Sequence, residues 1–279
     1  MTSYPAGATV AFVYSQDKIN QMYRIATWNV NSLRARLEHL RLWLSEADIE
    51  ILALQETKVQ DYDFPASALL ELGYTPYFSG QKAYNGVAFA SRSEGSLIAS
   101  EIPNFNDPQA RVLAVQFQNI CIVNLYVPNG GDVTTDKYEY KLRWLDGLIP
   151  WLRDLRENFK NLVIVGDFNI TPTDLDVHDP ESSKGQILCS AQERTRLQQI
   201  MALGFTDLFR QFDKSESKYT WWDYRGNGFL RNEGMRIDLI LGTTEVCNQA
   251  RRCEIDLEPR RWERPSDHAP VILEMAAEE

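Results

Sequence analysis

The sequence has few of the residues from which zinc sites and disulfide-bonded domains are built. Only three histidines occur, and no two of them have the spacing of a zinc site, which argues against a zinc enzyme. The four cysteines are scattered, and the surroundings of Cys121 and Cys189 are typical of free thiols. Because this pattern indicates a reducing compartment, we expect a cytoplasmic protein.

Long hydrophobic runs are also absent. No apolar stretch approaches the roughly 18 residues that a membrane-spanning helix needs, so we expect no association with a membrane. Residues 1–22 lack the basic start and the long apolar segment of a secretory signal. We interpret them as an accessory N-terminal extension.

Positive charge is scarce, since 29 Lys and Arg residues face 39 Asp and Glu residues, for a net charge of −10. Taken alone, this balance argues mildly against a nucleic-acid partner, because phosphate binding needs cations. Local basic clusters exist at Arg34, Arg36 and Arg41 and again at 260–264, although such runs are more often solvated surface. The many carboxylates indicate that any bound metal is a hard ion, Mg²⁺ or alternatively Mn²⁺.

The 279 residues are enough for one large domain or two small ones. Strands and amphipathic helices alternate along the chain without an internal repeat or a low-complexity linker, which favours a single α/β domain over residues 23–279. Predicted strands at Tyr23–Trp28 and Ile49–Leu54 flank a helical stripe of leucines between Leu33 and Leu44. Such a unit collects the polar groups that follow its strands at one edge of a sheet.

The segment LVIVGDFNIT, residues 162–171, is central to the functional argument. We expect Leu162–Val165 to form a strand covered on both faces, because its apolar run is unbroken, and Gly166 to permit a tight exit. Asp167 and Asn169 are two residues apart and point the same way in an extended chain, so they could bind a metal, a water or a phosphate. The alternative is an ordinary polar loop, since both residue types are common in turns.

Polar residues follow the other predicted strands in the same way. A hairpin over Arg111–Phe117 and Ile120–Val127 ends at a tyrosine, which could equally cap the core. The strand predicted at Arg236–Leu241 contains Asp238, and a carboxylate inside an apolar run needs a partner such as a histidine. Together these positions supply the groups for metal-assisted hydrolysis of a phosphate ester. They are Asn29, Glu56, Tyr126, Asp167, Asn169, Asp238, Asp267 and His268.

An unusual aromatic run, YTWWDYRGNG, occupies Tyr219–Gly228. Aromatic side chains beside an arginine, here Arg225, can stack on sugars or bases. The alternative is a core strand followed by a turn, which we expect to apply to at least one of the two tryptophans. A longer helix is predicted over Tyr138–Phe159, with Pro150 kinking or restarting it.

The motifs WNVN, LQETK, YVPNG, GDFN, RIDLIL and SDHAP, in this order and at these separations, resemble the exonuclease III family of abasic-site endonucleases. This family belongs to the endonuclease/exonuclease/phosphatase superfamily. The resemblance extends from about Tyr23 to Met275, and DYRGNGFLRNEGMRIDLIL is similar to the bacterial exonuclease III branch. It implies a four-layered α/β sandwich of the DNase I-like type: two facing mixed sheets, helices outside, and a site at one end.

The resemblance also implies roles for single residues. Asp167 would orient or deprotonate the attacking water, and Asn169 would hold the phosphate and stabilise its developing charge. His268 would contact the scissile phosphate, Asp238 would fix the tautomer of His268, and Tyr126 would donate a hydrogen bond to the phosphate. Glu56 would be the principal Mg²⁺ ligand. The whole implied metal site comprises Asn29, Glu56, Asp167, Asn169, Asp267 and His268.

A second implied group would contact the substrate. The ring of Trp221 would pack on the extruded abasic sugar, with Met235 and Ile237 lining the same pocket. Asn129 and Arg225 would contact the DNA. A pocket too small for a base selects an abasic sugar, and a missing base lowers the cost of flipping the nucleotide out.

The function that the resemblance implies is a monomeric, Mg²⁺-dependent DNA-repair hydrolase. It would cut double-stranded DNA on the 5′ side of abasic sites, leave a 3′-hydroxyl, and trim damaged 3′ ends. Two alternatives stay open: a phosphatase or phosphodiesterase of the same fold that acts on lipid or small-molecule phosphates, and a non-catalytic DNA-binding protein.

The chain departs from the family pattern at two places. Asn31 replaces an aspartate that many members have after WNV. Ser182 and Ser183 replace a basic–aromatic pair of the bacterial branch. The second departure leaves the balance of endonuclease, exonuclease and 3′-phosphatase activities open.

Overall fold

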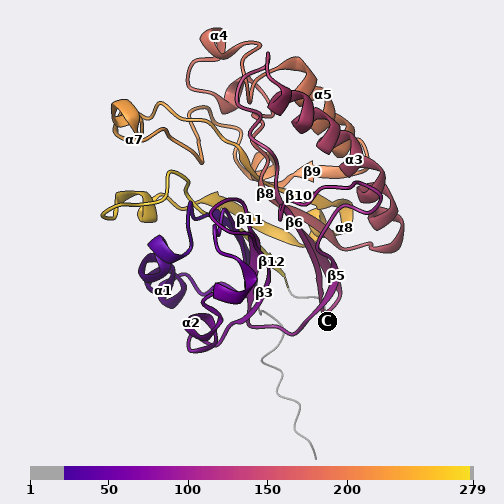
Figure 1. The fold of residues 1–279 in the computed structure, drawn as a ribbon, viewed down its shortest axis with the longest axis vertical. Coiled ribbons are helices and arrows are strands. Elements are labelled where there is room, and N and C mark those ends of the chain that lie inside the picture. The colour runs from indigo at the N-terminus through magenta and orange to yellow at the C-terminus, as the bar shows by residue number, and fades with distance from the viewer. Residues whose placement is uncertain (1–21, 277–279) are drawn as a thin grey trace, which may run out of the picture.

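Two six-stranded sheets face each other, and helices cover their outer sides (Figure 1). The computed structural model describes residues 22–276. The first sheet has the order β11 (Ala250–Ile255), β12 (Val271–Ala276), β1 (Met22–Asn29), β2 (Ile51–Gln55), β4 (Val87–Ser91) and β3 (Thr75–Ser79). The second has the order β5 (Gly95–Ala99), β6 (Val112–Phe117), β7 (Ile120–Tyr126), β8 (Leu162–Asp167), β10 (Asp238–Thr243) and β9 (Phe205–Asp207). Both are mixed, because β1 runs parallel to β2, and β7 runs parallel to β8.

Four of the helices lie in two pairs on opposite sides of the sandwich. In Figure 1, α1 and α2 cover the first sheet, whereas α3 and α5 cover the second. The helices are α1 (Leu37–Glu46), α2 (Ala66–Leu70), α3 (Asp136–Asn158), α4 (Pro180–Ser183), α5 (Ala191–Met201), α6 (Leu208–Phe212), α7 (Gly228–Arg231) and α8 (Thr244–Gln249). Short 3₁₀ segments, η2 (Arg34–Arg36), η3 (Asp61–Asp63), η4 (Asp174–Asp176), η5 (Arg225–Asn227) and η6 (Glu258–Arg261), lie in the connections.

Alternate residues of the central strands pack into different hydrophobic layers. In β8, Val163 and Val165 belong to the core between the two sheets, while Leu162 and Ile164 pack with residues of α3. This two-sided burial explains why the apolar run of β8 is unbroken. Three stacked hydrophobic layers separate four layers of secondary structure, so the predicted four-layered sandwich is confirmed.

The prediction that Gly166 forms a tight exit from its strand was wrong. Gly166 lies inside β8, opposite Leu239 of β10, and has a φ of 136°. A Cβ atom at this position would lie 1.9 Å from the carbonyl oxygen of Leu125 on the neighbouring strand. The glycine is therefore required by the close approach of two backbones, and the strand continues to Asp167.

Other predicted boundaries move by a few residues. Asp238 begins β10 and does not lie within a longer strand, and Pro150 lies inside α3 without dividing that helix. In the aromatic run, Trp222 is buried, as expected for one of the two tryptophans. Strand β1 begins at Met22, and residues 1–21 of the predicted extension lie outside the described residues.

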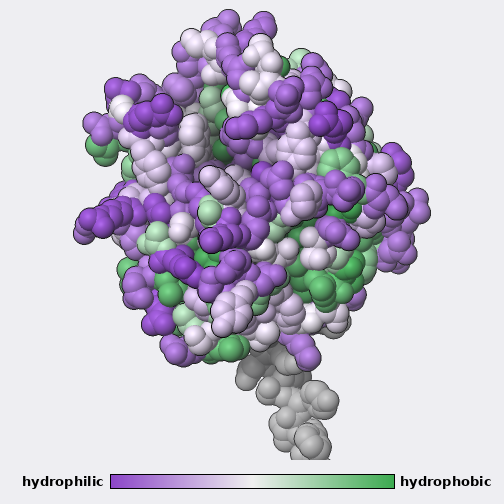
Figure 2. All heavy atoms as spheres, in the orientation of Figure 1, coloured by the Kyte–Doolittle hydropathy of each residue, from purple (hydrophilic) through white to green (hydrophobic). Residues whose placement is uncertain are grey.

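The surface in Figure 2 is mostly hydrophilic, and its broadest hydrophobic patch lies over the region of β5. The exposed side chain of Leu97 on β5 belongs to the outer strand of its sheet. This edge is separated from β8 by β6 and β7, so it is distinct from the strand ends described below. Within residues 22–276, no helix has the length and apolar character of a membrane span.

Candidate active site

The strand register brings the predicted polar residues to one end of the sandwich. In the second sheet, Tyr126 is the partner of Asp167 in the parallel pairing of β7 and β8. Asp167 is in turn the partner of Asp238 in the antiparallel pairing of β8 and β10. In the first sheet, Asn29 ends β1 beside Gln55, the residue before Glu56. The two sheets thus present their polar strand ends to each other.

Two candidate residues have left-handed backbone conformations within two residues of the ends of their strands. Glu56 has a φ of 51° and Asn169 a φ of 49°. Asparagine adopts this conformation at low cost, whereas glutamate seldom does. The carbonyl of Glu56 accepts a hydrogen bond of 2.8 Å from the backbone N–H of Ser32, which ties this turn to the loop after β1. Such conformations occur often at functional sites.

Asn29 connects two carboxylates from different sheets. Its Nδ2 donates to Glu56 Oε1 and to Asp167 Oδ2, both at 2.9 Å, and its Oδ1 accepts from the backbone N–H of Asn31. Lys58 Nζ lies 2.9 Å from the other oxygen of Glu56. Burial alone would raise the pKa of Glu56, but the hydrogen bond from Asn29 and the charge of Lys58 lower it. Glu56 is therefore a carboxylate at neutral pH.

His268 lies between two buried aspartates. Its Nδ1 is 2.8 Å from Asp238 Oδ2, and its Nε2 is 3.8 Å from Asp167 Oδ2. Burial disfavours the imidazolium, but the charges of Asp238 and then Asp167 outweigh it and raise the pKa of His268 to about 10. The ring is thus a cation that points one N–H at each aspartate.

At Asp167, in contrast to His268, the effect of burial on the pKa outweighs the attraction of the oppositely charged neighbour. Burial raises the pKa of Asp167 to about 7, and repulsion from Asp238 and Glu56 acts in the same direction, against the attraction of His268. A carboxyl group with a pKa near neutrality is suited to proton transfer at physiological pH. The pKa of Tyr126 is raised well above its usual value by burial and by the charges of Glu56 and Asp167, so this phenol stays a donor.

The amide of Asn169 is fixed by two hydrogen bonds. Its Nδ2 donates to the carbonyl of Val127 at 3.0 Å, and its Oδ1 accepts from Asn129 Nδ2 at 3.0 Å. Its backbone N–H donates to Asp167 Oδ1 at 2.9 Å. The loops after β7 and β8 are therefore joined to each other and to the central aspartate.

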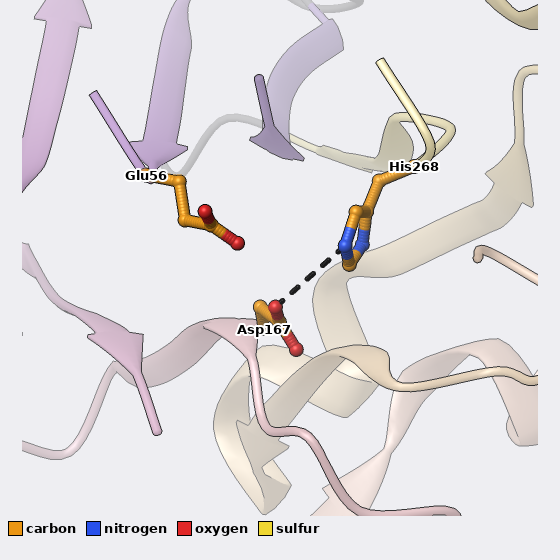
Figure 3. Close-up of side chains that lie close together, drawn as sticks. All are labelled: Glu56, Asp167 and His268. Atoms are coloured by element: carbon orange, nitrogen blue, oxygen red, sulfur yellow. Dashed lines mark ion pairs between the residues drawn. The ribbon is translucent and has the colours of Figure 1, made fainter. Parts of the chain in front are cut away.

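One group of side chains has the arrangement of a metal site. Figure 3 shows Glu56, Asp167 and His268 pointing toward one another from three segments of the chain, with ligand atoms within 4.8 Å of each other. Asp238 Oδ1 is buried beside this group and has no hydrogen-bond partner among residues 22–276. The carboxylates of Glu56 and Asp167 are donors that Mg²⁺ and Mn²⁺ prefer and fit such an ion, whereas His268 as an imidazolium has no free lone pair, so ligation by it stays a prediction.

The other predicted metal ligands have protein partners. Asp267 accepts hydrogen bonds from Asn31 Nδ2 at 2.8 Å and from Trp221 Nε1 at 3.1 Å. Asn29 directs its amide nitrogen, and not its oxygen, at the two carboxylates. In the described arrangement these residues orient their neighbours, and ligation by them stays a prediction.

The predicted substrate-contacting residues differ in their position relative to His268 and in their exposure. Trp221 forms bridge pairings with both Met235 and His268, so these segments lie beside the imidazole. Ile237 is only 2% exposed, which places its side chain among buried residues. Arg225 has a side chain that is 92% exposed and lies 3.3 Å from Asp223, on η5 next to α7, at the left of Figure 1.

Lys58 was missed by the sequence reasoning. Its Nζ donates to Asn31 Oδ1 at 2.5 Å as well as approaching Glu56. The signal was available, because Lys58 lies two residues after Glu56 in the quoted LQETK motif. Its cation lies beside the candidate metal ligands, where a phosphate would also need positive charge.

Known proteins resemble this chain in sequence and in fold. A model of the Endonuclease/Exonuclease/phosphatase family matches residues 26–268. Exodeoxyribonuclease III of Haemophilus influenzae is 32% identical, over 90% of this chain and 99% of the relative. A structure described as the 3′ phosphatase NExo from Neisseria bound to product DNA hairpin has a TM-score of 0.89 and 42% identity, over 91% of this chain and 99% of that one. An AP endonuclease from Archaeoglobus fulgidus has a TM-score of 0.87 and 35% identity, over 91% and 100%.

These similarities confirm the predicted fold, the predicted family and the predicted enzyme class of a hydrolytic nuclease. They do not assign a role to any single residue of the site. By the extent of the family match and the identity with its relatives, this chain belongs to the Endonuclease/Exonuclease/phosphatase family.

Proposed function

We propose that this chain is a Mg²⁺-dependent DNA-repair hydrolase, with Mn²⁺ as the alternative ion. It cuts double-stranded DNA on the 5′ side of abasic sites and trims damaged 3′ ends. The observation that carries the proposal is the position of His268 between Asp167 and Asp238, with Glu56 in the same cluster. The similarity to exodeoxyribonuclease III and to the archaeal AP endonuclease supports DNA as the substrate.

In the proposed mechanism, Asp167 takes a proton from the attacking water. Its pKa of about 7 makes the ionised form available at physiological pH while keeping it basic enough to accept a proton. The imidazolium of His268 donates its Nε2–H to a phosphate oxygen, and Asp238 fixes the ring through Nδ1. When bound, the divalent ion neutralises charge that develops on the phosphate.

Neutral donors complete the proposed phosphate site. Tyr126 stays protonated and donates its phenol hydrogen to the phosphate. Asn169, fixed by Asn129 and Val127, stabilises the charge of the transition state with its amide. Trp221 and Met235 lie beside His268 and would contact the extruded abasic sugar, with Ile237 behind them. Asn129 and Arg225 are the remaining proposed DNA contacts.

A nicking assay tests the proposal. The substrate is a duplex with one tetrahydrofuran abasic analogue, and an inositol phosphate serves as the alternative substrate. We expect a single nick 5′ to the analogue in Mg²⁺, no nick in EDTA, and a loss of at least about 100-fold in Asp167→Asn and in Glu56→Gln. Nicking that persists in EDTA or in Asp167→Asn would contradict the mechanism. Hydrolysis of the inositol phosphate alone would favour the small-molecule phosphatase.

A second candidate activity is removal of a 3′-terminal phosphate from DNA. The Neisseria structure that is 42% identical to this chain carries the description 3′ phosphatase. The same groups that stabilise a phosphodiester would stabilise a phosphomonoester. A duplex with a 3′-phosphate, assayed beside the abasic and undamaged duplexes, gives the ratio of the three activities.

The proposal also includes the state and location of the protein. We place it in the cytoplasm as a monomer. Cys121, Cys189, Cys247 and Cys253 are all free thiols, which is usual in a reducing compartment.

A further inference from the structure

Lys141 on α3 carries a buried cation close to the candidate active site. Its side chain is fully buried, as is that of its partner, Glu193 on α5. Lysine is almost never buried to this degree without a specific pairing. Burial lowers the pKa of Lys141, and the charge of Glu193 opposes this effect. The pair therefore needs a reason beyond the packing of the two helices.

All three N–H bonds of the ammonium have acceptors. Nζ lies 2.5 Å from Glu193 Oε1, 2.6 Å from the carbonyl oxygen of Asn169, and 3.1 Å from the carbonyl oxygen of Asn129. Two of the three bonds thus go to the backbone of the loops after β7 and β8. Gly130 permits this approach, because a Cβ atom there would lie 3.1 Å from Lys141 Cδ.

The two residues whose carbonyls meet at Lys141 also meet through their side chains. Asn129 Nδ2 donates to Asn169 Oδ1, and Asn169 holds a left-handed conformation with a φ of 49°. Asparagine adopts this conformation at low cost, so what the contacts determine is the position of the turn relative to the strand ends. Lys141 contacts the turn through the backbone carbonyl of Asn169, whereas Asn129 contacts it through the side-chain amide.

Glu193 anchors the ammonium to the rigid part of the fold. Its Oε1 also accepts from the backbone N–H of Leu188, and its Oε2 accepts from the N–H of Ser190 in the capping box of α5. The position of the ammonium is therefore set by the start of a helix as well as by α3.

We propose that Lys141, held by Glu193, is a positioning residue that sets the conformation of Asn169 and Asn129 at the phosphate site. It touches no substrate and acts through the two asparagines. The inference rests on the proposed function, because it assumes that Asn169 stabilises the reacting phosphate. A salt bridge that only joins α3 to α5 would not require bonds to both loop carbonyls.

The test is a double substitution in the full-length chain, Lys141→Met with Glu193→Gln, assayed on the abasic duplex in Mg²⁺. Removing both charges together avoids leaving one of them buried and unpaired. We expect kcat to fall by about 10- to 100-fold with KM nearly unchanged, because the displaced amide is needed in the transition state. The same double substitution in the Asn169→Ala background should change kcat by less than about twofold.

Leu145→Ala is the matched control, since Leu145 lies one helical turn further along α3 in the hydrophobic core. It should lower thermal stability while keeping kcat. Glu193→Gln alone is the second variant, because it preserves shape and should lower kcat by a smaller factor. The inference would be overturned if kcat were unchanged in the double variant or in Glu193→Gln. It would also be overturned if the double substitution lowered kcat equally in the Asn169→Ala background. Absence of nicking by the unsubstituted protein would instead overturn the proposed function.

Discussion

Asp167 and Asp238 are direct partners in the pairing of β8 with β10, and one imidazole lies between their carboxylates. Two buried carboxylates side by side would repel each other strongly without a cation. His268 supplies that cation, and its ring is oriented by the same contacts. The strand register thus determines the charge of the histidine, while burial, with repulsion from Asp238 and Glu56, raises the pKa of Asp167.

The first prediction concerns this orientation. Asp238→Asn should lower kcat by about 100-fold, because His268 loses the carboxylate that fixes Nδ1 and raises the pKa of the ring. In the variant, the fall of kcat on the alkaline side of its pH profile should also begin at a lower pH, because the pKa of His268 is lowered. Glu274→Gln is the control, since this carboxylate lies on β12 and pairs with Arg24, at 3.5 Å. Equal kcat values for Asp238→Asn and the unsubstituted protein would exclude the role of Asp238.

The second prediction concerns metal binding and pH. Asp167 must be ionised to ligate Mg²⁺, and its pKa of about 7 means that a proton competes with the ion below neutrality. The rise in melting temperature on adding a fixed Mg²⁺ concentration should therefore be larger at pH 8 than at pH 6. Asp167→Asn should remove this difference. A shift that is the same at both pH values in the unsubstituted protein would show that Asp167 is not a ligand.

In the metal-free protein, the contribution of Asp167 to stability should fall as the pH rises, which is opposite to the effect expected with Mg²⁺. The pKa of Asp167 is raised in the folded state from 3.8 to about 7. Its contribution to stability is therefore fully present below pH 3.8 and is lost as the pH rises through 7. With Mg²⁺ present, stability should instead rise with pH in the neutral range. A thermal-shift experiment with and without Mg²⁺ therefore separates the effect of the proton from that of the ion.

Short-range patterns were sufficient to predict the inner strands and their polar ends, whereas the edge strands β3, β5, β9 and β11 were not predicted. The unbroken run of β8 and the residues that follow β1, β2 and β7 could be identified because each signal lies within a few positions. Lys141 could not be predicted, since it lies in a helical stripe beside Leu142 and its partner is 52 residues away. Arg260 was similarly interpreted as surface charge, but it is 5% exposed and lies 4.8 Å from the centre of the Phe229 ring.

The third prediction concerns Gly166. Gly166→Ala should lower the free energy of unfolding by about 3 kcal/mol, because the residue has a φ of 136° and its Cβ would meet the carbonyl of Leu125. Because Asp167 is the next residue, activity should also fall at temperatures where the variant is folded. Gly185→Ala is the matched control: its φ is 74°, but nothing lies within 4 Å of its Cβ, so we expect about 1 kcal/mol. Chemical denaturation measures both, and equal losses would contradict the close-approach explanation.

The fourth prediction separates the two adjacent tryptophans. Trp221 is half-buried beside His268, whereas Trp222 is fully buried against Tyr219 and Phe229. Trp221→Ala should lower kcat/KM on the abasic duplex by about tenfold, the usual effect of losing one stacking ring. Trp221→Phe should recover most of that loss, because it keeps a ring and removes only the N–H that donates to Asp267. Trp222→Phe should lower stability and leave kcat/KM within about twofold once the protein is folded. If Trp221→Phe is as impaired as Trp221→Ala, the tryptophan acts by holding Asp267, and its ring does not contact the sugar.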